Sequence, residues 1–279
     1  MKWKRNHQSA EQVPRTVGVA AMSQNQLRDK YLSIERDIHF DKSETVLDGY
    51  WQTWESNARY EDGLATYKND TFRNSENFVV AYEAAVRQAT SRGLDPHIRW
   101  RAHIFESLLR SAGPGTRLEL GTAHGFMFYF ALTKHQLDGC LDTNASVVLV
   151  DKFTQEAVDP VSGFILRGTN AWYASDLSKV KNLFRPFPNV RIQQGVVPDV
   201  LSTLDLGPIS FLHLDLNAAR PEARALEELW PNLLVGAIVL FDDYGWIDFS
   251  ATKDAHDHLV SRFGRSICVL PTGQGLLIK

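Results

Sequence analysis

The stretch Leu118-Glu119-Leu120-Gly121-Thr122-Ala123-His124-Gly125 decides the fold of this chain, and the apolar run of residues 126–132 follows it directly. Its apolar start predicts a short buried strand (117–120), its glycines a tight turn, and the apolar run a helix that begins near Gly125. Glycine has no Cβ and tolerates positive φ, so backbone N–H groups and a helix N-terminus can approach a ligand closely at such a turn. The stretch therefore predicts a strand–turn–helix unit that binds a ligand.

Strands and helices alternate along the chain after this unit. Apolar runs predict strands at residues 146–150, 190–194, 211–214 and 237–241, and helical spacing predicts helices at 176–184, 221–234 and 250–262. Two short strands, 266–270 and 275–278, end the sequence. The segment between them is too short for a parallel crossover, which needs a dozen or more residues, so this pair must be antiparallel. The order predicts an α/β fold with a mostly parallel seven-stranded sheet that ends in an antiparallel strand pair.

The first 112 residues do not follow this alternation. Residues 1–24 are polar and lack periodicity, which predicts a flexible arm. Residues 26–60 are rich in aromatic side chains, which serve either as packing or as a lid over a substrate. Apolar residues at helical spacing then predict helices at 76–88 and 98–109. We therefore expect an arm (1–24), a helical and aromatic extension that could act as a lid (25–112), and a catalytic domain (113–279).

The composition limits the partners of the chain. Thirty Lys and Arg against 33 Asp and Glu give a net charge of −3, whereas binding to nucleic acid or to an anionic membrane favours a basic excess. Cys140 and Cys268 lie far apart, without the spacing of a zinc site or a disulfide framework, which favours a reducing cytoplasm. No apolar run has the length of a membrane span, and no apolar core follows the basic N-terminus. We expect a cytoplasmic protein with a small-molecule partner; assembly into a homo-oligomer stays open.

Acidic residues recur where the predicted strands end. Asp151 follows the second strand, Asp215 the fourth, and Asp242 and Asp243 the fifth. Ligands of open α/β sheets bind at the carboxyl ends of the strands, so we expect these side chains to face one site. Asp151 is placed to accept hydrogen bonds from ribose hydroxyls, unless it is simply a solvated aspartate. With no basic residue expected nearby, the other three would repel one another unless they hold a hard cation such as Mg²⁺. The alternative is that Asp242 caps a turn and Asp243 faces water.

The acidic residue before the first glycine distinguishes between cofactors. A dinucleotide pyrophosphate would favour Gly-x-Gly-x-x-Gly, with no carboxylate directed at it. Glu119, one residue, Gly121, three residues and Gly125 instead resemble the first motif of class I S-adenosylmethionine methyltransferases. The resemblance implies the Rossmann-like fold of that class and S-adenosylmethionine as cofactor. The residues expected to hold the cofactor are Glu119, Gly121, Thr122, Gly125, Asp151 and Gly195.

A second resemblance covers roughly residues 95–279. It rests on Trp100-Arg101-Ala102-His103, on residues 195–198, on Phe211-Leu-His-Leu-Asp-Leu-Asn217 and on Asp242-Asp243-Tyr244-Gly245. These motifs are similar to those of the macrocin O-methyltransferase family, bacterial metal-dependent enzymes that methylate sugar hydroxyls of natural products. The resemblance implies that Asp215, Asp242 and Asp243 hold a divalent metal such as Mg²⁺. It also implies that the chain methylates a hydroxyl of a small molecule.

One position departs from that family. Its members often have a carboxylate, suited to general base catalysis, two residues after the first metal aspartate, where this chain has Asn217. An amide cannot take a proton at neutral pH. Either no base is needed beside Asp215, or another group serves, such as His213 on the same strand face or His124 in the glycine loop, or the substrate differs. A metal-independent N- or O-methyltransferase and a non-catalytic S-adenosylmethionine-binding protein are the alternatives.

Overall fold

A computed structural model describes residues 59–66, 68–90, 93–153 and 175–279. The predicted arm and nearly all of the aromatic segment 26–60 lie outside these residues. The chain divides into two compact units, one of residues 1–60 and 65–67 and the other of residues 61–64 and 68–279. The described residues of the first unit belong to a short hairpin, β1 (Arg59–Glu61) and β2 (Leu64–Thr66).

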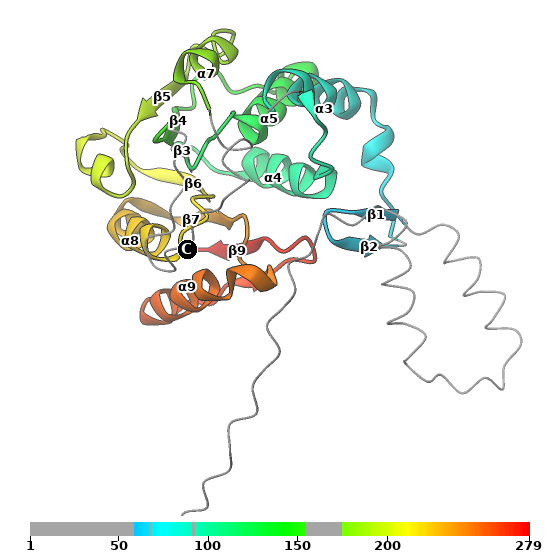
Figure 1. Cartoon of the computed structure of the whole chain (residues 1–279). Coiled ribbons are helices and arrows are strands. Elements are labelled where there is room, and N and C mark those ends of the chain that lie inside the picture. Colours follow the sequence, from blue (N-terminus) through cyan, green and yellow to red (C-terminus); the bar gives the residue numbers. More distant parts are fainter. Residues whose placement is uncertain (1–58, 67, 91–92, 154–174) are drawn as a thin grey trace, which may run out of the picture. The chain divides into compact units, whose positions relative to one another are not determined.

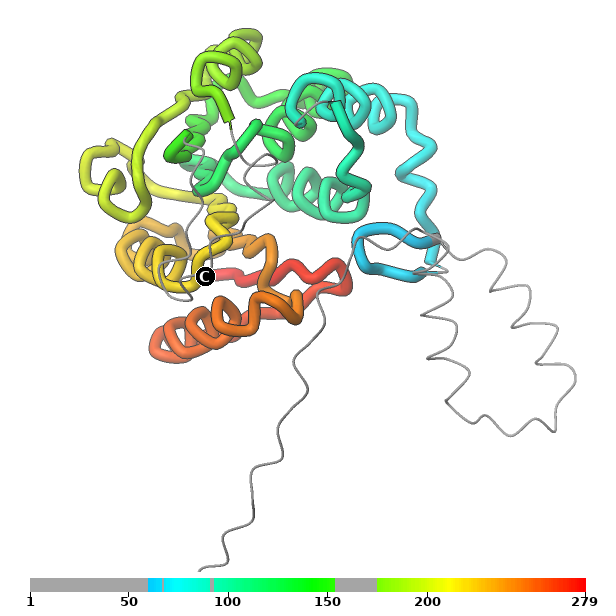
Figure 2. The backbone as a smooth tube through the Cα atoms, in the orientation of Figure 1, coloured from blue at the N-terminus to red at the C-terminus, as the bar shows by residue number. Residues whose placement is uncertain are grey.

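The second unit is built on a seven-stranded sheet with the order β5-β4-β3-β6-β7-β9-β8. Five strands run parallel, and β9 pairs antiparallel with both β7 and β8. In Figure 2 the red tube near the C-terminus turns back on the segment that precedes it. This confirms the predicted fold class. The strands are β3 (Thr116–Leu120), β4 (Val147–Asp151), β5 (Val190–Gln194), β6 (Ile209–Leu214), β7 (Leu233–Phe241), β8 (Cys268–Val269) and β9 (Gly275–Ile278).

Helices cover both faces of this sheet (Figure 1). The α-helices are α3 (Glu76–Gln88), α4 (Arg99–Ser111), α5 (Phe126–Leu137), α7 (Leu177–Leu183), α8 (Ala219–Leu229) and α9 (Ser250–Arg262). Short 3₁₀ turns are η1 (Thr71–Asn74), η3 (Asp199–Thr203), η4 (Trp230–Asn232) and η5 (Ile247–Phe249). None of the helices in the described part of the chain has the length and hydrophobicity needed to cross a bilayer.

The apolar strands supply two separate cores. Successive residues of a strand point to opposite faces, so Val147 and Leu149 of β4 belong to the core that includes side chains of α3, α4 and α5, while Val148 and Val150 belong to the core that includes side chains of α8 and α9. All four side chains are fully buried. Strands that are apolar on both faces are typical of a parallel sheet between two helical layers.

The two helices before β3 belong to the same compact unit as the sheet. Phe105 of α4 packs edge-on against Phe211 of β6 with ring centroids 5.4 Å apart, and Phe78 of α3 packs against Phe130 of α5 at 5.1 Å. Phe78, Phe105 and Phe130 are all essentially inaccessible to solvent. The first residues of α4 are thereby fixed relative to the strands, which matters for the site.

The helix predicted at 221–234 is shorter than expected. It begins at Ala219 and ends at Leu229, and β7 starts at Leu233, four residues before the predicted strand at 237. Pro231 has no N–H to donate and its ring clashes with the carbonyl four residues earlier, so the chain passes through the turn η4 and leaves the helix. The sequence prediction wrongly placed this proline inside the helix.

Candidate active site

The glycine loop joins β3 to α5 as predicted. Gly121 has φ +100°, and a Cβ at this position would lie 1.8 Å from the carbonyl oxygen of Asp215. Only glycine allows the end of β3 to approach the end of β6 so closely. Gly125 has φ +85° and is the residue before α5, and its N–H donates to the Thr122 carbonyl at 2.7 Å.

Asp151 ties three strand ends together. Its Oδ2 accepts a hydrogen bond from the Ala123 N–H at 2.8 Å, and its Oδ1 accepts one from the Phe153 N–H at 2.8 Å. Its carbonyl accepts from the N–H of Gly195 at 2.9 Å. The residues expected to hold the cofactor thus lie at the ends of β3, β4 and β5, which are adjacent strands.

Two polar atoms of this region are buried without a hydrogen-bond partner among the described residues. They are Oε2 of Glu119 and the hydroxyl of Thr122. Both residues line a cavity of about 490 Å³. Buried polar groups are normally paired, so each unpaired group needs an explanation. A ligand with N–H or O–H donors would supply partners here, and the ammonium group and ribose hydroxyls of S-adenosylmethionine fit that description.

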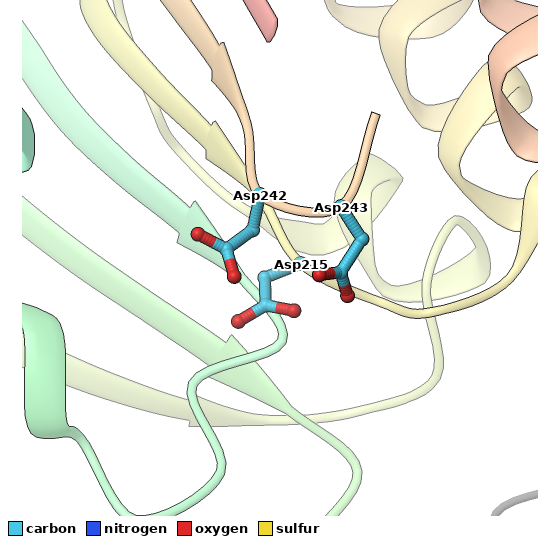
Figure 3. Close-up of side chains that lie close together, drawn as sticks. All are labelled: Asp215, Asp242 and Asp243. Atoms are coloured by element: carbon cyan, nitrogen blue, oxygen red, sulfur yellow. The ribbon is translucent and has the colours of Figure 1, made fainter. Parts of the chain in front are cut away.

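The acidic cluster, defined as Asp215, Asp242 and Asp243, lies where β6 and β7 end. One carboxylate oxygen from each residue lies within 4.8 Å of the other two, and Figure 3 shows the three side chains turned toward one another. The main chain fixes them, because the Asp215 N–H donates to the Leu120 carbonyl at 2.9 Å and the Asp242 N–H to the Leu214 carbonyl at 3.0 Å. All three residues line the same cavity as Glu119. The structure therefore brings together the residues predicted to bind metal.

Arg101 of α4 contradicts the expectation that no basic residue lies nearby. Its Nη1 donates to Oδ2 of Asp242 at 2.5 Å and to Oδ1 of Asp243 at 3.3 Å. Its Nε donates to Oδ2 of Asp62 at 2.7 Å, and its guanidinium lies 5.1 Å from the ring centroid of Trp246. The sequence separation from Asp242 is 141 residues, so local patterns could not reveal this contact. The only sequence signal was the position of Arg101 in the motif Trp100-Arg101-Ala102-His103.

The three carboxylates of the cluster share their negative charge unequally. Burial and the charges of Asp242 and Asp243 raise the pKa of Asp215 well above its usual value. Burial and Asp242 likewise raise the pKa of Asp243 to about 7, against the opposing charge of Arg101. At Asp242, burial acts to raise the pKa, but Arg101 and His213 outweigh it and lower the pKa. Asp242 is therefore fully charged at neutral pH, whereas Asp243 carries only part of a charge.

His213 bridges the cofactor region and the acidic cluster. Its Nδ1 lies 3.0 Å from Oε1 of Glu119, and its Nε2 lies 3.5 Å from Oδ1 of Asp242. Burial acts to lower the pKa of this fully enclosed imidazole, but Asp242 and Glu119 outweigh it and raise the pKa to about 10. An imidazolium has no free lone pair at neutral pH. His213 therefore does not suit the role of general base that the sequence suggested.

Asn217 and His124 both line the cavity. The Asn217 amide donates to Oδ1 of Asp215 at 3.2 Å, so it orients a carboxylate of the cluster. Its φ of +55° is unusual for a residue other than glycine. Sequence reasoning missed the support for this turn: Oε1 of Glu222 in α8 accepts from the Leu216 N–H at 2.9 Å, and Oε2 of Glu222 lies 3.2 Å from the His256 ring.

The chemistry of the cluster fits a divalent cation. Carboxylate oxygens are the ligands that Mg²⁺ prefers, and the cluster offers three carboxylates. Among the described residues, none donates a hydrogen bond to Oδ2 of Asp215 or of Asp243. Asp242 differs, because Arg101 donates to its Oδ2 and Gln274 to its Oδ1 at 3.2 Å. Arg101 thus lies where it would meet such a cation.

Comparisons with known proteins agree with this geometry. The model of a methyltransferase domain family matches residues 118–244, from the strand before the glycine loop to just beyond the cluster. The solved structure of the O-methyltransferase NovP superposes with a TM-score of 0.59 at 16% identity, covering 72% of this chain and 99% of that one. The calicheamicin methyltransferase CalS11 superposes with a TM-score of 0.54 at 18% identity, covering 76% and 94%. No curated protein sequence matches the chain.

The fold and the matched domain both resemble those of methyltransferases. A mostly parallel sheet with the antiparallel strands β8 and β9 at one edge is the class I methyltransferase architecture. Residues 118–244 match a methyltransferase domain family, and the sheet has the fold of solved methyltransferases. The narrower resemblance to the macrocin O-methyltransferase family stays a prediction.

Proposed function

We propose that the chain is a divalent-metal-assisted O-methyltransferase that transfers the methyl group of S-adenosylmethionine to a hydroxyl of a small molecule. One observation carries this proposal: the acidic cluster and the glycine loop line one cavity of about 490 Å³. Glu119, Gly121, Thr122, Gly125, Asp151 and Gly195 would hold the cofactor. The cluster would hold the metal and the acceptor beside it.

The chemistry follows from this division of the cavity. When bound, a divalent ion would supply a charge that lowers the pKa of the acceptor hydroxyl. S-adenosylmethionine would supply a methyl group activated by its sulfonium, which the acceptor oxygen would take while the sulfur leaves as a neutral thioether. Because the methyl group is already activated, orientation by the chain supplies most of the catalysis. His213 contributes by contacting both Glu119 and Asp242, which fixes the distance between these two carboxylates. His124 is the cavity-lining candidate to take the proton.

The acceptor class rests on the relatives and on the sequence resemblance. NovP is described as an O-methyltransferase and CalS11 as a calicheamicin methyltransferase. Together with the resemblance to enzymes that methylate sugars, this supports a hydroxyl of a natural product, such as a sugar, as the acceptor.

The experiment is a turnover assay with a panel of hydroxylated acceptors, read as S-adenosylhomocysteine formed. We expect turnover to stop when EDTA removes divalent ions and to return with added Mg²⁺. Asn217→Asp is the paired variant, since it restores the carboxylate that the resemblance implies. A rise in rate would show that a base was limiting; an altered acceptor preference would show that Asn217 belongs to the acceptor site.

A second candidate function is favoured by the position of Arg101. Its guanidinium already supplies a positive charge to Asp242 and Asp243. A metal-independent methyltransferase could use that charge in place of a cation. Full turnover in excess EDTA would support this candidate and remove the metal from the mechanism.

A further inference from the structure

We propose that Arg101 is a built-in competitor of the divalent ion: its guanidinium holds the acidic cluster closed and must leave Asp242 and Asp243 before an ion binds there. This role rests on the proposed metal-assisted function and adds a control on the same site. Metal affinity would then depend on Arg101 of α4 as well as on the carboxylates that follow β6 and β7.

The first observation is that one nitrogen bridges two carboxylates. Nη1 of Arg101 lies 2.5 Å from Oδ2 of Asp242 and 3.3 Å from Oδ1 of Asp243. Mg²⁺ binds carboxylate oxygens at about 2.0–2.1 Å, so an ion between these two residues would lie within a few ångströms of Nη1. Two positive centres at that separation, in a site where Asp242 is only 8% exposed, repel each other strongly. The guanidinium and the ion therefore exclude each other.

The second observation is that Arg101 has other partners that would keep it in place. Its Nε, which does not contact the cluster, donates to Asp62 at 2.7 Å. The Cζ atom of its guanidinium lies over the ring of Trp246, 5.1 Å from the ring centroid. These contacts hold the arginine while Nη1 is released.

Asp62 itself is firmly placed. Its side chain is 6% exposed, and it sits in the turn between β1 and β2 with φ +53°. The next residue, Gly63, packs so closely on Trp246 that a Cβ would lie 2.9 Å from the indole ring. Asp62 and Trp246 thus provide fixed contacts that would keep the guanidinium nearby after Nη1 leaves the cluster. A purely structural salt bridge would also be buried, but it would not change how the chain binds metal.

The test is calorimetric titration of Mn²⁺ into the full chain. We compare wild type, Arg101→Gln and the matched control Arg99→Gln. Arg99 lies in the same turn of α4 and pairs with Glu61 at 2.7 Å and Asp95 at 2.6 Å, and within the described part of the chain none of its ion pairs involves the cluster. We expect Arg101→Gln to bind Mn²⁺ about 10-fold more tightly or better and Arg99→Gln to match wild type within about 2-fold.

The outcomes separate this role from the function on which it rests. Equal or weaker Mn²⁺ binding by Arg101→Gln would overturn the competition and leave the metal site in place. Absence of Mn²⁺ binding to all three proteins would overturn both the competition and the metal-assisted function.

A second variant keeps Arg101 and removes its hydrogen bond to Asp62. Asp62→Asn removes the partner that retains the guanidinium, so Arg101 should hold Asp242 and Asp243 more strongly. We expect Mn²⁺ binding to weaken about 3-fold or more in the wild-type background and to change less in the Arg101→Gln background. Unchanged or tighter binding in the wild-type background, or an equal loss in both, would overturn the proposed competition.

Discussion

Asp243 is the residue whose replacement separates metal chemistry from cofactor binding. It lies in the acidic cluster and lines the cavity, but among the described residues no hydrogen bond joins its side chain to the glycine loop. Asn keeps the size of Asp and removes the charge that a small, strongly hydrated cation needs before it sheds water. We expect Asp243→Asn to lower metal-dependent turnover on the order of 100-fold or more, with the affinity for S-adenosylmethionine unchanged. Turnover assays with a Mg²⁺ series and calorimetry with the cofactor measure the two effects.

The matched control for this variant is Asp248→Asn. Asp248 lies in η5 and is exposed, so the same chemical change should leave both quantities near their wild-type values. Wild-type turnover by Asp243→Asn in the presence of Mg²⁺ would contradict the assignment of Asp243 as a ligand.

His213 makes stability depend on pH in a defined direction. Asp242 and Glu119 outweigh burial and raise its pKa to about 10, from a usual value of 6.5. Between these values the folded chain keeps a proton that the unfolded chain has released, so the stabilisation is complete below pH 6.5 and is lost as the pH rises through 10. We expect the free energy of unfolding, measured by urea denaturation without metal, to fall between about pH 8 and 9.5, by up to about 1.4 kcal/mol per unit from this group.

The His213→Gln variant should show a flatter dependence over the same range. His258→Gln is the control, because His258 is exposed on α9 and its loss should leave the slope unchanged. A slope that is the same in wild type and in His213→Gln would mean that His213 does not hold a proton in the folded chain.

Among the elements, the contact between β3 and β6 depends on one glycine. The Cβ of an alanine at position 121 would lie 1.8 Å from a backbone oxygen of Asp215, which cannot yield unless the two strands move apart. We expect Gly121→Ala to lower the free energy of unfolding by more than about 3 kcal/mol, since strain at positive φ and overpacking act together. Urea denaturation measures the change.

Gly139, after α5, provides the matched control for that substitution. It also has positive φ, +69°, but a Cβ there would meet no atom within 4 Å. Gly139→Ala should therefore cost only about 1 kcal/mol, the strain of the backbone alone. Equal losses in the two variants would mean that the close approach at Gly121 is not what requires glycine.

The bounds of a helix or strand were predicted correctly where the residues that determine them are close in sequence. Helices at 76–88 and 250–262 and the strand at 190–194 were predicted with their observed bounds, because their periodicity and flanking residues are local. The helix at 221–234 was predicted too long because periodicity continued across Pro231. The hairpin β1–β2 was missed, although the Asp62-Gly63 pair at its turn is a local hairpin signal.

The site was predictable where strand ends determine it and not where helices complete it. The carboxyl ends of parallel strands meet at one edge, so the closeness of Asp215, Asp242 and Asp243 followed from the order of elements alone. The contact of Arg101 with Asp242 depends on how α4 packs against the sheet, which periodicity does not specify. The raised pKa of His213, which argues against a role as general base, likewise follows from two buried carboxylate neighbours that the sequence does not locate.

At the scale of the whole molecule, cofactor binding should increase the free energy of unfolding. Glu119 and Thr122 have buried polar atoms without partners among the described residues, and the cofactor would fill the cavity they line. A ligand that binds only the folded state, at 100 times its Kd, stabilises it by about 2.7 kcal/mol. We expect S-adenosylmethionine to raise the melting temperature in this way and NAD to have no effect. Binding of NAD alone in calorimetry would contradict the assignment of this cavity.

The hydrogen bonds from the Asp215 and Asp242 amides to the carbonyls of Leu120 and Leu214 have a consequence for protein engineering. They continue the hydrogen bonding of the sheet by one residue at the ends of β6 and β7. The backbone of Asp215 and Asp242 is therefore held as firmly as the strands themselves. Part of the cavity wall comes instead from outside the strands, from residues such as Leu94, Pro96, Ile98 and Phe249. Variant libraries restricted to those wall positions should therefore change which acceptors bind while the positions of Asp215 and Asp242 stay the same.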